Sequence, residues 1–417
     1  MDSSTWDNLT RSVQAVLTRR RLGRLAGGVA LAAAVSAVVS GNESEAKRRV
    51  RGEHNIRGKK AIMCIDGETR RVPKKKRKKY LKRGATRGAC QVTPPVCVPK
   101  CPAGACGDDG CGGQCPACPM GQVCADGICQ GCSVSCDVAT ETPAECGETL
   151  RTALLTGGNV YVCPGEYEGT FVLSTNVNVY GAGSGTDPAT NAILTGSDTY
   201  QTMTVESPIT VRLANVRLTN GYSTYGANLY IDDAVANVTT TDCVYAQGRG
   251  EYGQGIYVYY GTLAVDRCQF RNNEGNYYGG AILNYYGTVT LANSLFQDNI
   301  GESGGGALCA YDSPGAMQVT GCTFTGNTSD YGGAVYIYDG AASFSNSTFT
   351  RNTAETGGAI YVYNGPATLD ATVSITNNTA TDLAPSGGGV MVVGGTFTRN
   401  GATISGNTPD QCIGAGC

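Results

Sequence analysis

The sequence predicts an all-β protein in which residues 142–417 form a right-handed parallel β-helix. A glycine-rich marker recurs seven times, and the apolar residues that end it are 27, 26, 26, 27, 25 and 30 positions apart: Leu229, Ile256, Ile282, Leu308, Val335, Ile360 and Val390. A second marker follows in the same phase at Tyr245, Phe270, Phe296, Phe324, Phe349, Ile375 and Ile404. Two markers in one phase indicate a solenoid, because each unit buries its apolar face by stacking on its neighbours.

The short runs inside each unit decide which solenoid this is. Residues 335–338 and 360–363 alternate at period two, and turn residues such as Asp339-Gly340 follow them. No unit has ten residues at helical spacing, so helical repeats are excluded. A coil of about 26 residues with short strands is typical of a parallel β-helix, and we expect about nine or ten coils.

An asparagine stands three residues after most of the second markers. The column contains Asn273, Asn299, Asn327, Asn352, Asn378 and Asn407. Asparagine tolerates left-handed backbone geometry, and stacked amides can bond from coil to coil. We therefore expect these residues to sit at a bend and to form a hydrogen-bonded ladder.

The paired Gly-Gly-Ala-[Ile/Leu/Val] and Phe-x-x-Asn markers resemble the repeats of chlamydial polymorphic outer-membrane proteins and of secreted bacterial β-helix proteins. The likeness covers about residues 225–407. It implies a surface-displayed rod used in adhesion, which in that family is carried by a C-terminal membrane barrel. Because no barrel-length segment follows the repeats before Cys417, we do not expect autotransport. Residues 167–183 resemble the first coils of pectate-lyase-like folds.

Both ends of the rod have sequence features that can close them. Residues 146–156 predict a short helix with Leu150, Ala153 and Leu154 on one face, which would cap the N-terminal end. We expect a Cys146–Cys163 bridge to pin this helix to the first coil. Cys412 and Cys417 can close the far end.

The first 46 residues have the features of an export signal. Residues 18–24 resemble a twin-arginine motif, and an Ala/Gly/Val-rich stretch follows at 25–40. That stretch is too short for a stable membrane span, so we expect no span in the mature protein. The alternative is an arginine-rich amphipathic N-terminus. Export predicts a secreted or cell-surface protein.

Cysteines are concentrated in a module at residues 90–141. The chain has 20 Cys, of which 12 lie from Cys90 to Cys146, in a segment with little apolar material. In an exported protein such a segment is held by disulfides. Zinc bound through Cys115-x-x-Cys118 and Cys129-x-x-Cys132 is the alternative reading. We expect neither a metal nor a cofactor.

A basic stretch at residues 47–89 precedes the module. Residues 1–90 hold 23 Lys and Arg against 7 Asp and Glu, whereas residues 91–417 hold 9 against 27. This stretch (47–87) either is a solvated linker or contacts an anionic cell-surface polymer or the acidic rod itself. We do not expect nucleic acid as a partner. A hairpin with an Asp66-Gly67 turn, and a Cys64–Cys90 pair, would make the stretch a small basic subdomain.

Catalysis on this fold needs carboxylates clustered on one face. The best candidates are Asp232, Asp233 and Asp266 with Arg267 or Arg249, although Asp232-Asp233 also fits a plain turn. The repeats are regular, which argues against a deep site. An extracellular polysaccharide lyase or hydrolase is therefore the second functional hypothesis, and a passive spacer is the third.

The leading hypothesis is a non-catalytic rod that contacts glycans or matrix through tyrosines. Strand alternation predicts two outward columns beside each apolar marker. Their tyrosines are Tyr230, Tyr257, Tyr336 and Tyr361 in the first column and Tyr259, Tyr285, Tyr311, Tyr338 and Tyr363 in the second. Such a ladder can stabilise the sheet by itself, and it can also serve as an interaction surface.

Overall fold

The computed structural model describes residues 60–65, 68–73, 76–83, 86–87, 101–107, 115–119, 121–313, 315–383 and 385–417. The predicted export signal, the Asp66-Gly67 turn and Cys90 lie outside these residues. The chain divides into two compact units, residues 1–96 and 97–417. In the described part of the chain, no helix is long and apolar enough to cross a membrane.

The N-terminal unit contains a small antiparallel sheet. Strand β1 (Lys60–Ile65) pairs with β2 (Glu68–Pro73) and with β3 (Thr86–Arg87), and helix α3 (Arg77–Leu81) lies between β2 and β3 in sequence. Met63, Ile65 and Val72 form its buried cluster. The antiparallel register extends to the pair Ile65 and Glu68, as the predicted hairpin requires.

The second unit starts with the cysteine-rich module, which is built around a hairpin. Strands β4 (Gln122–Ala125) and β5 (Ile128–Gly131) pair antiparallel. Three disulfides cross-link the described part of this segment: Cys101–Cys115, Cys106–Cys124 and Cys118–Cys129. Val123 and Ala125 of the hairpin pack on Tyr180 and Ala214 of the rod.

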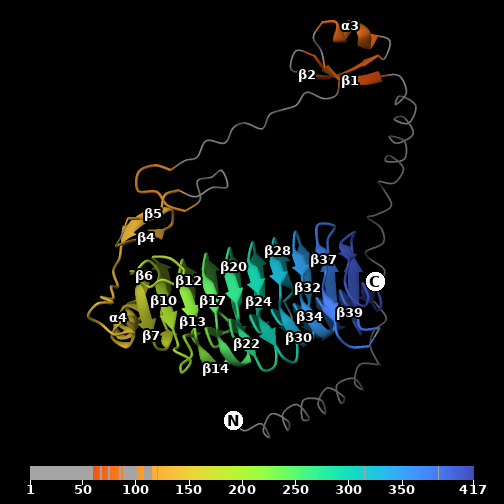
Figure 1. Ribbon diagram of the computed structural model, residues 1–417. Coiled ribbons are helices and arrows are strands. Elements are labelled where there is room, and N and C mark those ends of the chain that lie inside the picture. Colours follow the sequence, from red (N-terminus) through yellow and green to blue (C-terminus); the bar gives the residue numbers. More distant parts are fainter. Residues whose placement is uncertain are drawn as a thin grey trace, which may run out of the picture. The chain divides into compact units, whose positions relative to one another are not determined.

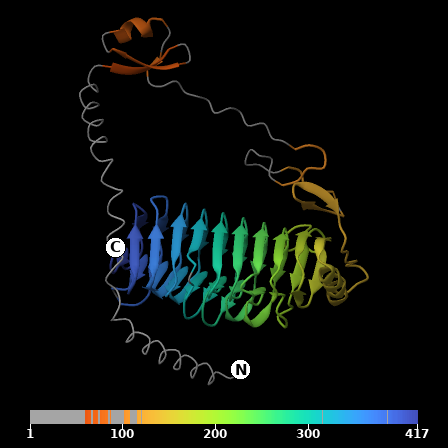
Figure 2. The same cartoon turned by 180° about the vertical axis from the view of Figure 1, so that it is seen from behind.

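The rest of this unit is a parallel β-helix, whose coils stack along one axis (Figures 1 and 2). Three parallel sheets of 10 strands each run its length. Sheet 1 contains β6 (Gly158–Val162), β9 (Val177–Gly181), β12 (Thr210–Ala214), β16 (Asn237–Thr241), β20 (Thr262–Asp266), β24 (Thr288–Ala292), β28 (Met317–Thr320), β32 (Ala342–Ser345), β36 (Pro366–Leu369) and β40 (Thr396–Arg399). Sheet 2 contains β7 (Gly165–Glu168), β10 (Ala192–Thr195), β13 (Arg217–Thr219), β17 (Val244–Ala246), β21 (Gln269–Arg271), β25 (Leu295–Gln297), β29 (Thr323–Thr325), β33 (Thr348–Thr350), β37 (Ser374–Thr376) and β41 (Thr403–Ser405).

Sheet 3 contains β8 (Phe171–Leu173), β11 (Met203–Val205), β15 (Leu229–Ile231), β19 (Ile256–Val258), β23 (Ile282–Asn284), β27 (Leu308–Tyr311), β31 (Val335–Tyr338), β35 (Ile360–Asn364), β39 (Val390–Val392) and β42 (Cys412–Ile413). A fourth sheet, of 7 strands, lies between sheets 2 and 3 along the chain. It contains β14 (Tyr222–Tyr225), β18 (Arg249–Tyr252), β22 (Glu274–Gly275), β26 (Ile300–Gly301), β30 (Thr328–Tyr331), β34 (Thr353–Thr356) and β38 (Thr379–Ala380). These central coils are therefore four-sided, one side more than the two or three strands predicted for each coil.

In-register stacking of like residues builds the core. Phe270, Phe296, Phe324 and Phe349 form one column on sheet 2, with ring centroids 4.6 to 4.7 Å apart and nearly parallel planes. All four side chains are fully buried. Stacked rings at the coil repeat remove apolar surface from water and gain ring–ring contact at every step.

The asparagine column forms a buried hydrogen-bonded ladder. The side-chain amide of Asn299 donates to the Asn327 side-chain oxygen, and that of Asn327 donates to Asn352, both at 2.9 Å. Each side-chain oxygen also accepts the backbone N–H of the preceding ladder residue, as in Asn299 to Asn327 at 3.1 Å. The expected left-handed backbone was wrong for these residues. The positive φ belongs to the residue just before each one, for example Asp298 (54°) and Asn377 (57°).

Helix α4 (Pro143–Thr156) lies at the N-terminal end of the rod (Figure 1). A capping box between Thr142 and Glu145 starts it, and Leu150 and Leu154 enter the core of the rod. The expected Cys146–Cys163 bridge was wrong, because Cys146 pairs with Cys136. At the far end, a disulfide joins Cys412 to Cys417.

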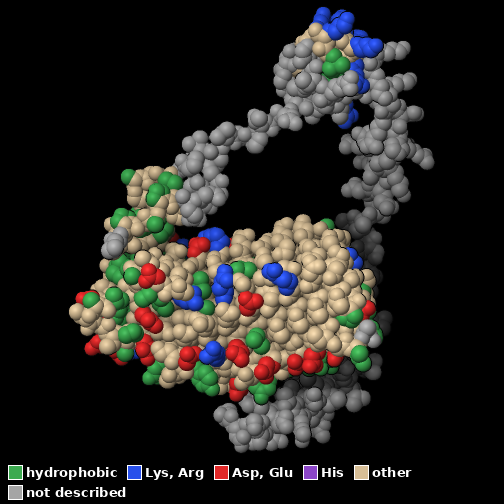
Figure 3. Space-filling model, in the orientation of Figure 1, with side chains coloured by type: hydrophobic (Ala, Val, Ile, Leu, Met, Phe, Trp, Pro, Cys, Tyr) green, Lys and Arg blue, Asp and Glu red, His purple; other side chains and the backbone are tan. Residues whose placement is uncertain are grey.

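Acidic side chains gather along one long edge of the rod, the lower edge in Figure 3. The fourth sheet and the turn after it contribute exposed acids in successive coils: Glu302, Asp330, Glu355 and Asp382.

Candidate functional site: the tyrosine face of the rod

Three of the four tyrosines in the first column on sheet 3 are buried, so their predicted exposure was wrong, whereas Tyr230 is partly exposed. Tyr257, Tyr336 and Tyr361 are only 5%, 6% and 8% exposed. The fourth sheet causes this burial, because tyrosines at or just after its strands lie against the column. Tyr225 contacts Tyr257 with ring centroids 5.4 Å apart, and Tyr331 contacts Tyr361 at 5.1 Å.

The second column is half-exposed and forms a continuous stack, called the tyrosine ladder below. Its members are Tyr259, Tyr285, Tyr311, Tyr338 and Tyr363, and successive ring centroids are 5.5, 5.1, 4.5 and 4.9 Å apart. Planes within the ladder diverge by 5 to 22°. In-register strand pairing accounts for the step from Tyr311 to Tyr338. At the next step the register shifts, so that Tyr338 pairs with Asn364 while its ring stacks on that of Tyr363.

The stacking of the rings determines which parts of the tyrosine side chains a ligand can contact. Each ring inside the ladder has both faces covered by its neighbours, so only ring edges and hydroxyls are left for solvent. A sugar can therefore accept or donate hydrogen bonds along the ladder, but it can stack on a ring face only at the ends.

Burial makes phenols on this face harder to ionise. It raises the pKa of Tyr259 to about 12, with the neighbouring Tyr260 hydroxyl as the next cause. Burial also raises the pKa of Tyr278, which flanks the ladder, to about 12. The face is therefore an array of neutral hydrogen-bonding groups at physiological pH.

The predicted catalytic carboxylates lie at separate places. Asp233 accepts hydrogen bonds from the backbone N–H groups of Val235 and Ala236, at 2.8 and 3.2 Å, as an ordinary turn residue does. Asp266 ends β20 in sheet 1, where it pairs with Arg267. In the part of the chain that the structure describes, no hydrogen bond or ion pair joins Asp232 or Asp233 to Asp266.

Arg249 and Arg267 likewise have separate partners. Arg267 binds both carboxylate oxygens of Asp242 at 2.9 Å, and Arg249 lies 3.7 Å from Asp198. The ion pairs with Asp242 and Asp266 raise the pKa of Arg267 and keep it charged. Neither arginine is free to act as a base.

The regularity of the repeats argued against a deep site, yet the structure contains a cleft of about 1010 Å³. The cysteine-rich module supplies one wall, with Gln122 and Asp126, and sheet 1 and its bends supply the other, with Arg212 and Asp242. Asp126 pairs with Arg212, and the hydroxyl of Tyr180 donates to the same carboxylate. These bonds, first that of Tyr180, lower the pKa of Asp126, the opposite of what a general acid requires.

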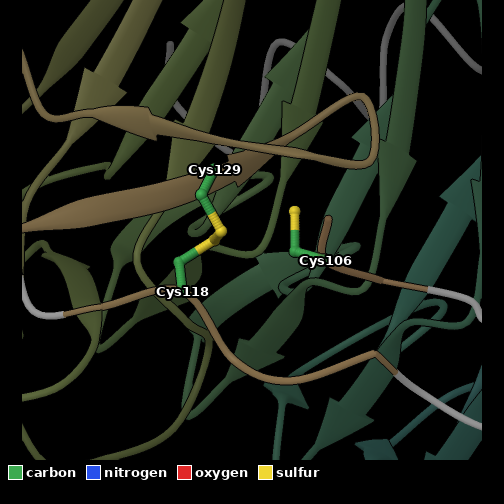
Figure 4. Close-up of side chains that lie close together, drawn as sticks. All are labelled: Cys106, Cys118 and Cys129. Carbon is green, nitrogen blue, oxygen red and sulfur yellow. A yellow bond between two sulfur atoms is a disulfide. The ribbon is translucent and has the colours of Figure 1, made fainter. Parts of the chain in front are cut away.

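Three of the four cysteines of the alternative zinc site, Cys115, Cys118 and Cys129, form disulfides, whereas Cys132 is a free thiol. Figure 4 shows Cys118 bonded to Cys129, with Cys106 beside them. The three sulfurs lie within 4.8 Å of one another, and Cys106 is itself bonded to Cys124. A disulfide sulfur is no thiolate, so in this state the cluster does not offer the donor set of a structural zinc site.

A second buried ladder was missed at the bend between sheets 1 and 2. Cys243, Cys268, Ser294, Cys322 and Ser347 stand two residues before successive aromatic markers, which is the sequence signal for this column. The N–H of Cys268 donates to the Ser294 hydroxyl at 3.1 Å, and the N–H of Cys243 donates to the Cys268 sulfur at 3.4 Å. The thiols therefore act as serine equivalents inside the rod.

Comparison with known proteins supports the fold only. The model of the right-handed β-helix region family matches residues 175–380. Neither curated proteins nor solved structures provide a match to this chain. The fold class is thus a right-handed parallel β-helix with a disulfide-linked N-terminal module.

Proposed function

We propose that this protein is a secreted or surface-associated rod without catalytic activity, which contacts glycans or matrix proteins through its tyrosine ladder. The half-exposed row of phenol hydroxyls from Tyr259 to Tyr363 is the observation that carries this proposal. A regular row of neutral donors and acceptors fits a polymer with repeated hydroxyl or amide groups.

Three further features support a location outside the cell. The cysteine-rich module is disulfide-linked, as is common in oxidising compartments. The match to the right-handed β-helix family covers most of the rod, and the repeats resemble surface-displayed adhesion rods. The basic stretch at residues 47–87 would hold such a rod to an anionic cell-surface polymer.

The test removes hydroxyls and keeps rings. In the full chain, Tyr311→Phe, Tyr338→Phe and Tyr363→Phe are combined, and binding is measured on glycan arrays and to purified matrix polymers. Loss of binding with an unchanged thermal midpoint supports the proposal. The control is Tyr245→Phe, which removes a buried hydroxyl bonded to Thr240. Binding that survives the triple substitution contradicts the role of the ladder, and no binding by the wild type favours a passive spacer.

The second candidate function is cleavage of an extracellular polysaccharide, which would take place in the cleft beside the cysteine-rich module. Asp126 and Asp242 line this cleft, and both are ion-paired with arginines. Reducing-end or unsaturated-product assays on acidic polysaccharides test it. Activity that is lost in Asp242→Asn would establish an enzyme, and activity that persists in that variant would locate the reaction elsewhere.

A further inference from the structure

Four tyrosines on two neighbouring coils form a cluster that differs from the rest of the tyrosine ladder. Tyr259 meets Tyr260 edge to face with ring centroids 4.4 Å apart and planes at 68°, and Tyr285 meets Tyr286 at 4.4 Å and 84°. The two pairs stack on each other, because Tyr260 lies 5.5 Å from Tyr286 and Tyr259 lies 5.5 Å from Tyr285. Tyr260 and Tyr286 are 36% and 37% exposed.

The local sequence explains why the cluster occurs only there. Both pairs end a sheet 3 segment as Tyr-Tyr-Gly-Thr, and the backbone N–H of Tyr286 donates to the carbonyl of Tyr259 at 3.1 Å. In the next three coils the position of the second tyrosine is taken by Asp312, Asp339 and Asn364. Those coils continue the parallel ladder without a second tyrosine next to the ladder residue, and the edge-to-face contact there, between Tyr336 and Tyr338, is longer, at 5.9 Å.

Ring orientation matters for the chemistry of phenols. A phenol that loses one electron and one proton becomes a phenoxyl radical, whose reactive carbons lie at the ring edge beside the oxygen. Parallel stacking turns faces toward each other, whereas edge-to-face contact brings a ring edge against its neighbour. Two edge-to-face pairs in contact, each with one exposed ring, are therefore arranged for coupling between rings, because the rings are already close together and need no diffusional encounter.

We propose that the cluster of Tyr259, Tyr260, Tyr285 and Tyr286 is a site of oxidative coupling, where two of its rings become joined by a carbon–carbon bond. Each phenol gives up one electron and one proton. The two ortho carbons form the bond, and their hydrogens move to the oxygens as the rings regain aromaticity. Hydrogen peroxide, acting through a haem peroxidase, accepts the two electrons and two protons and leaves as two waters.

The composition of the rod favours this chemistry over other covalent links. No lysine follows Lys100, so amine-based cross-links cannot form on the rod. Four of the free thiols in the described part of the rod, those of Cys243, Cys268, Cys309 and Cys322, are buried, and Cys163, which is partly exposed, interacts with Cys132. The coupling requires no glycan or matrix contact, so it stands or falls independently of the proposed function.

The experiment treats the folded full chain with hydrogen peroxide and a haem peroxidase, then measures dityrosine fluorescence and maps tryptic peptides by mass spectrometry. Cleavage after Arg249, Arg267, Arg271 and Arg351 separates residues 250–267 from residues 272–351. Coupling within one pair lightens one of these peptides by two hydrogens, and coupling between coils joins the two. Either product, assigned to the four named rings by fragmentation, supports the site.

Two double variants make the test specific. Tyr260→Phe with Tyr286→Phe keeps the rings but removes two phenols, and the dityrosine yield should fall about tenfold because each edge-to-face pair then lacks one of the two phenols that couple. Tyr200→Phe with Tyr222→Phe removes two phenols that are 48% and 57% exposed, and the yield should be unchanged. An equal yield in Tyr260→Phe/Tyr286→Phe, or couplings that map outside the cluster, would overturn the proposal. Thermal melts confirm that each variant is folded.

Discussion

The hydroxyl of Tyr180, on β9 of the rod, donates a 2.9 Å hydrogen bond to the carboxylate of Asp126 in the cysteine-rich module. Arg212, on β12, pairs with the same carboxylate and lies over the Tyr180 ring, 5.3 Å from its centroid. Together with the apolar contact of Val123 and Ala125, these bonds seat the module on sheet 1. They also form part of the cleft wall.

Removing this contact should loosen the module without unfolding the rod. We expect Asp126→Asn to speed hydrogen–deuterium exchange in β4 and β5, because the charged hydrogen bonds are lost. The pKa of Asp126 is lower in the folded protein than in the unfolded chain, where it is about 4. The ionised carboxylate therefore stabilises the folded state fully at pH values above about 4. That contribution is lost as the pH falls through the lowered value. Asp137→Asn is the control, because Asp137 bonds only within its own turn, to Ala139, Thr140 and Glu141. Equal exchange in both variants would contradict the seating role.

The asparagine ladder should be among the most sensitive positions of the rod. Asn327→Ala leaves the buried amide and N–H of Asn299 without their acceptor, and it opens a cavity. We expect a loss of about 2–4 kcal/mol in the free energy of unfolding. Thermal or denaturant unfolding measures it. Asn364→Ala, at an exposed site that bonds to Asp339, should cost below about 1 kcal/mol. Similar losses at both sites would show that the ladder does not contribute as described.

Five of the seven markers contain two adjacent glycines, and at Gly333 the next coil requires the second one. A Cβ on Gly333 would lie 2.4 Å from the carbonyl oxygen of Gly358. Gly333→Ala should therefore force neighbouring coils apart and lower the thermal midpoint, at a cost of about 1–3 kcal/mol. Gly131→Ala is the matched control, because a Cβ there meets nothing within 4 Å. An unchanged midpoint in Gly333→Ala would mean that the coils yield easily at this point.

The tyrosine face should resist alkaline titration. The pKa of Tyr259 and that of Tyr278 are raised to about 12, whereas a free phenol titrates near ~10. Their contribution to stability is complete below about pH 10 and is lost as the pH rises toward the folded values. Ultraviolet titration should show tyrosinate absorbance delayed in the folded rod and shifted to about pH 10 in denaturant. Coincident titration curves for the two states would contradict the burial of this face.

The free thiols should fall into two classes. Cys132 and Cys163 are partly exposed and their side chains interact, whereas Cys243, Cys268, Cys309 and Cys322 are buried. A disulfide oxidant should therefore join Cys132 to Cys163 in the folded protein, and peptide mapping under non-reducing conditions would detect the bond. Cys132→Ser should leave Cys163 as the first thiol to be alkylated. Faster alkylation of the buried four would contradict the packing.

Periodicity made much of the fold predictable. The glycine and aromatic markers repeat with the coil, so the repeat length, the inward columns and the number of coils follow from the spacing alone. Helix α4 was predictable because Leu150, Ala153 and Leu154 share one face and a glycine pair follows them. The regular spacing of the asparagines indicated a hydrogen-bonded ladder. The left-handed backbone conformation, however, belongs to the residue before each asparagine and not to the asparagine itself.

The sequence by itself determined that this chain is a solenoid of stacked β coils, because the same markers recur in every coil at the same spacing. The concentration of cysteines before the repeats likewise determined that a cross-linked module precedes the rod. The tertiary structure alone decided which tyrosines are buried, which cysteines pair, and that a cleft lies beside the module. Those outcomes depend on side chains brought together from distant positions, such as Cys136 with Cys146 and Asp126 with Arg212. No local pattern encodes such distances, since they arise only when the fourth sheet and the module pack against the rod.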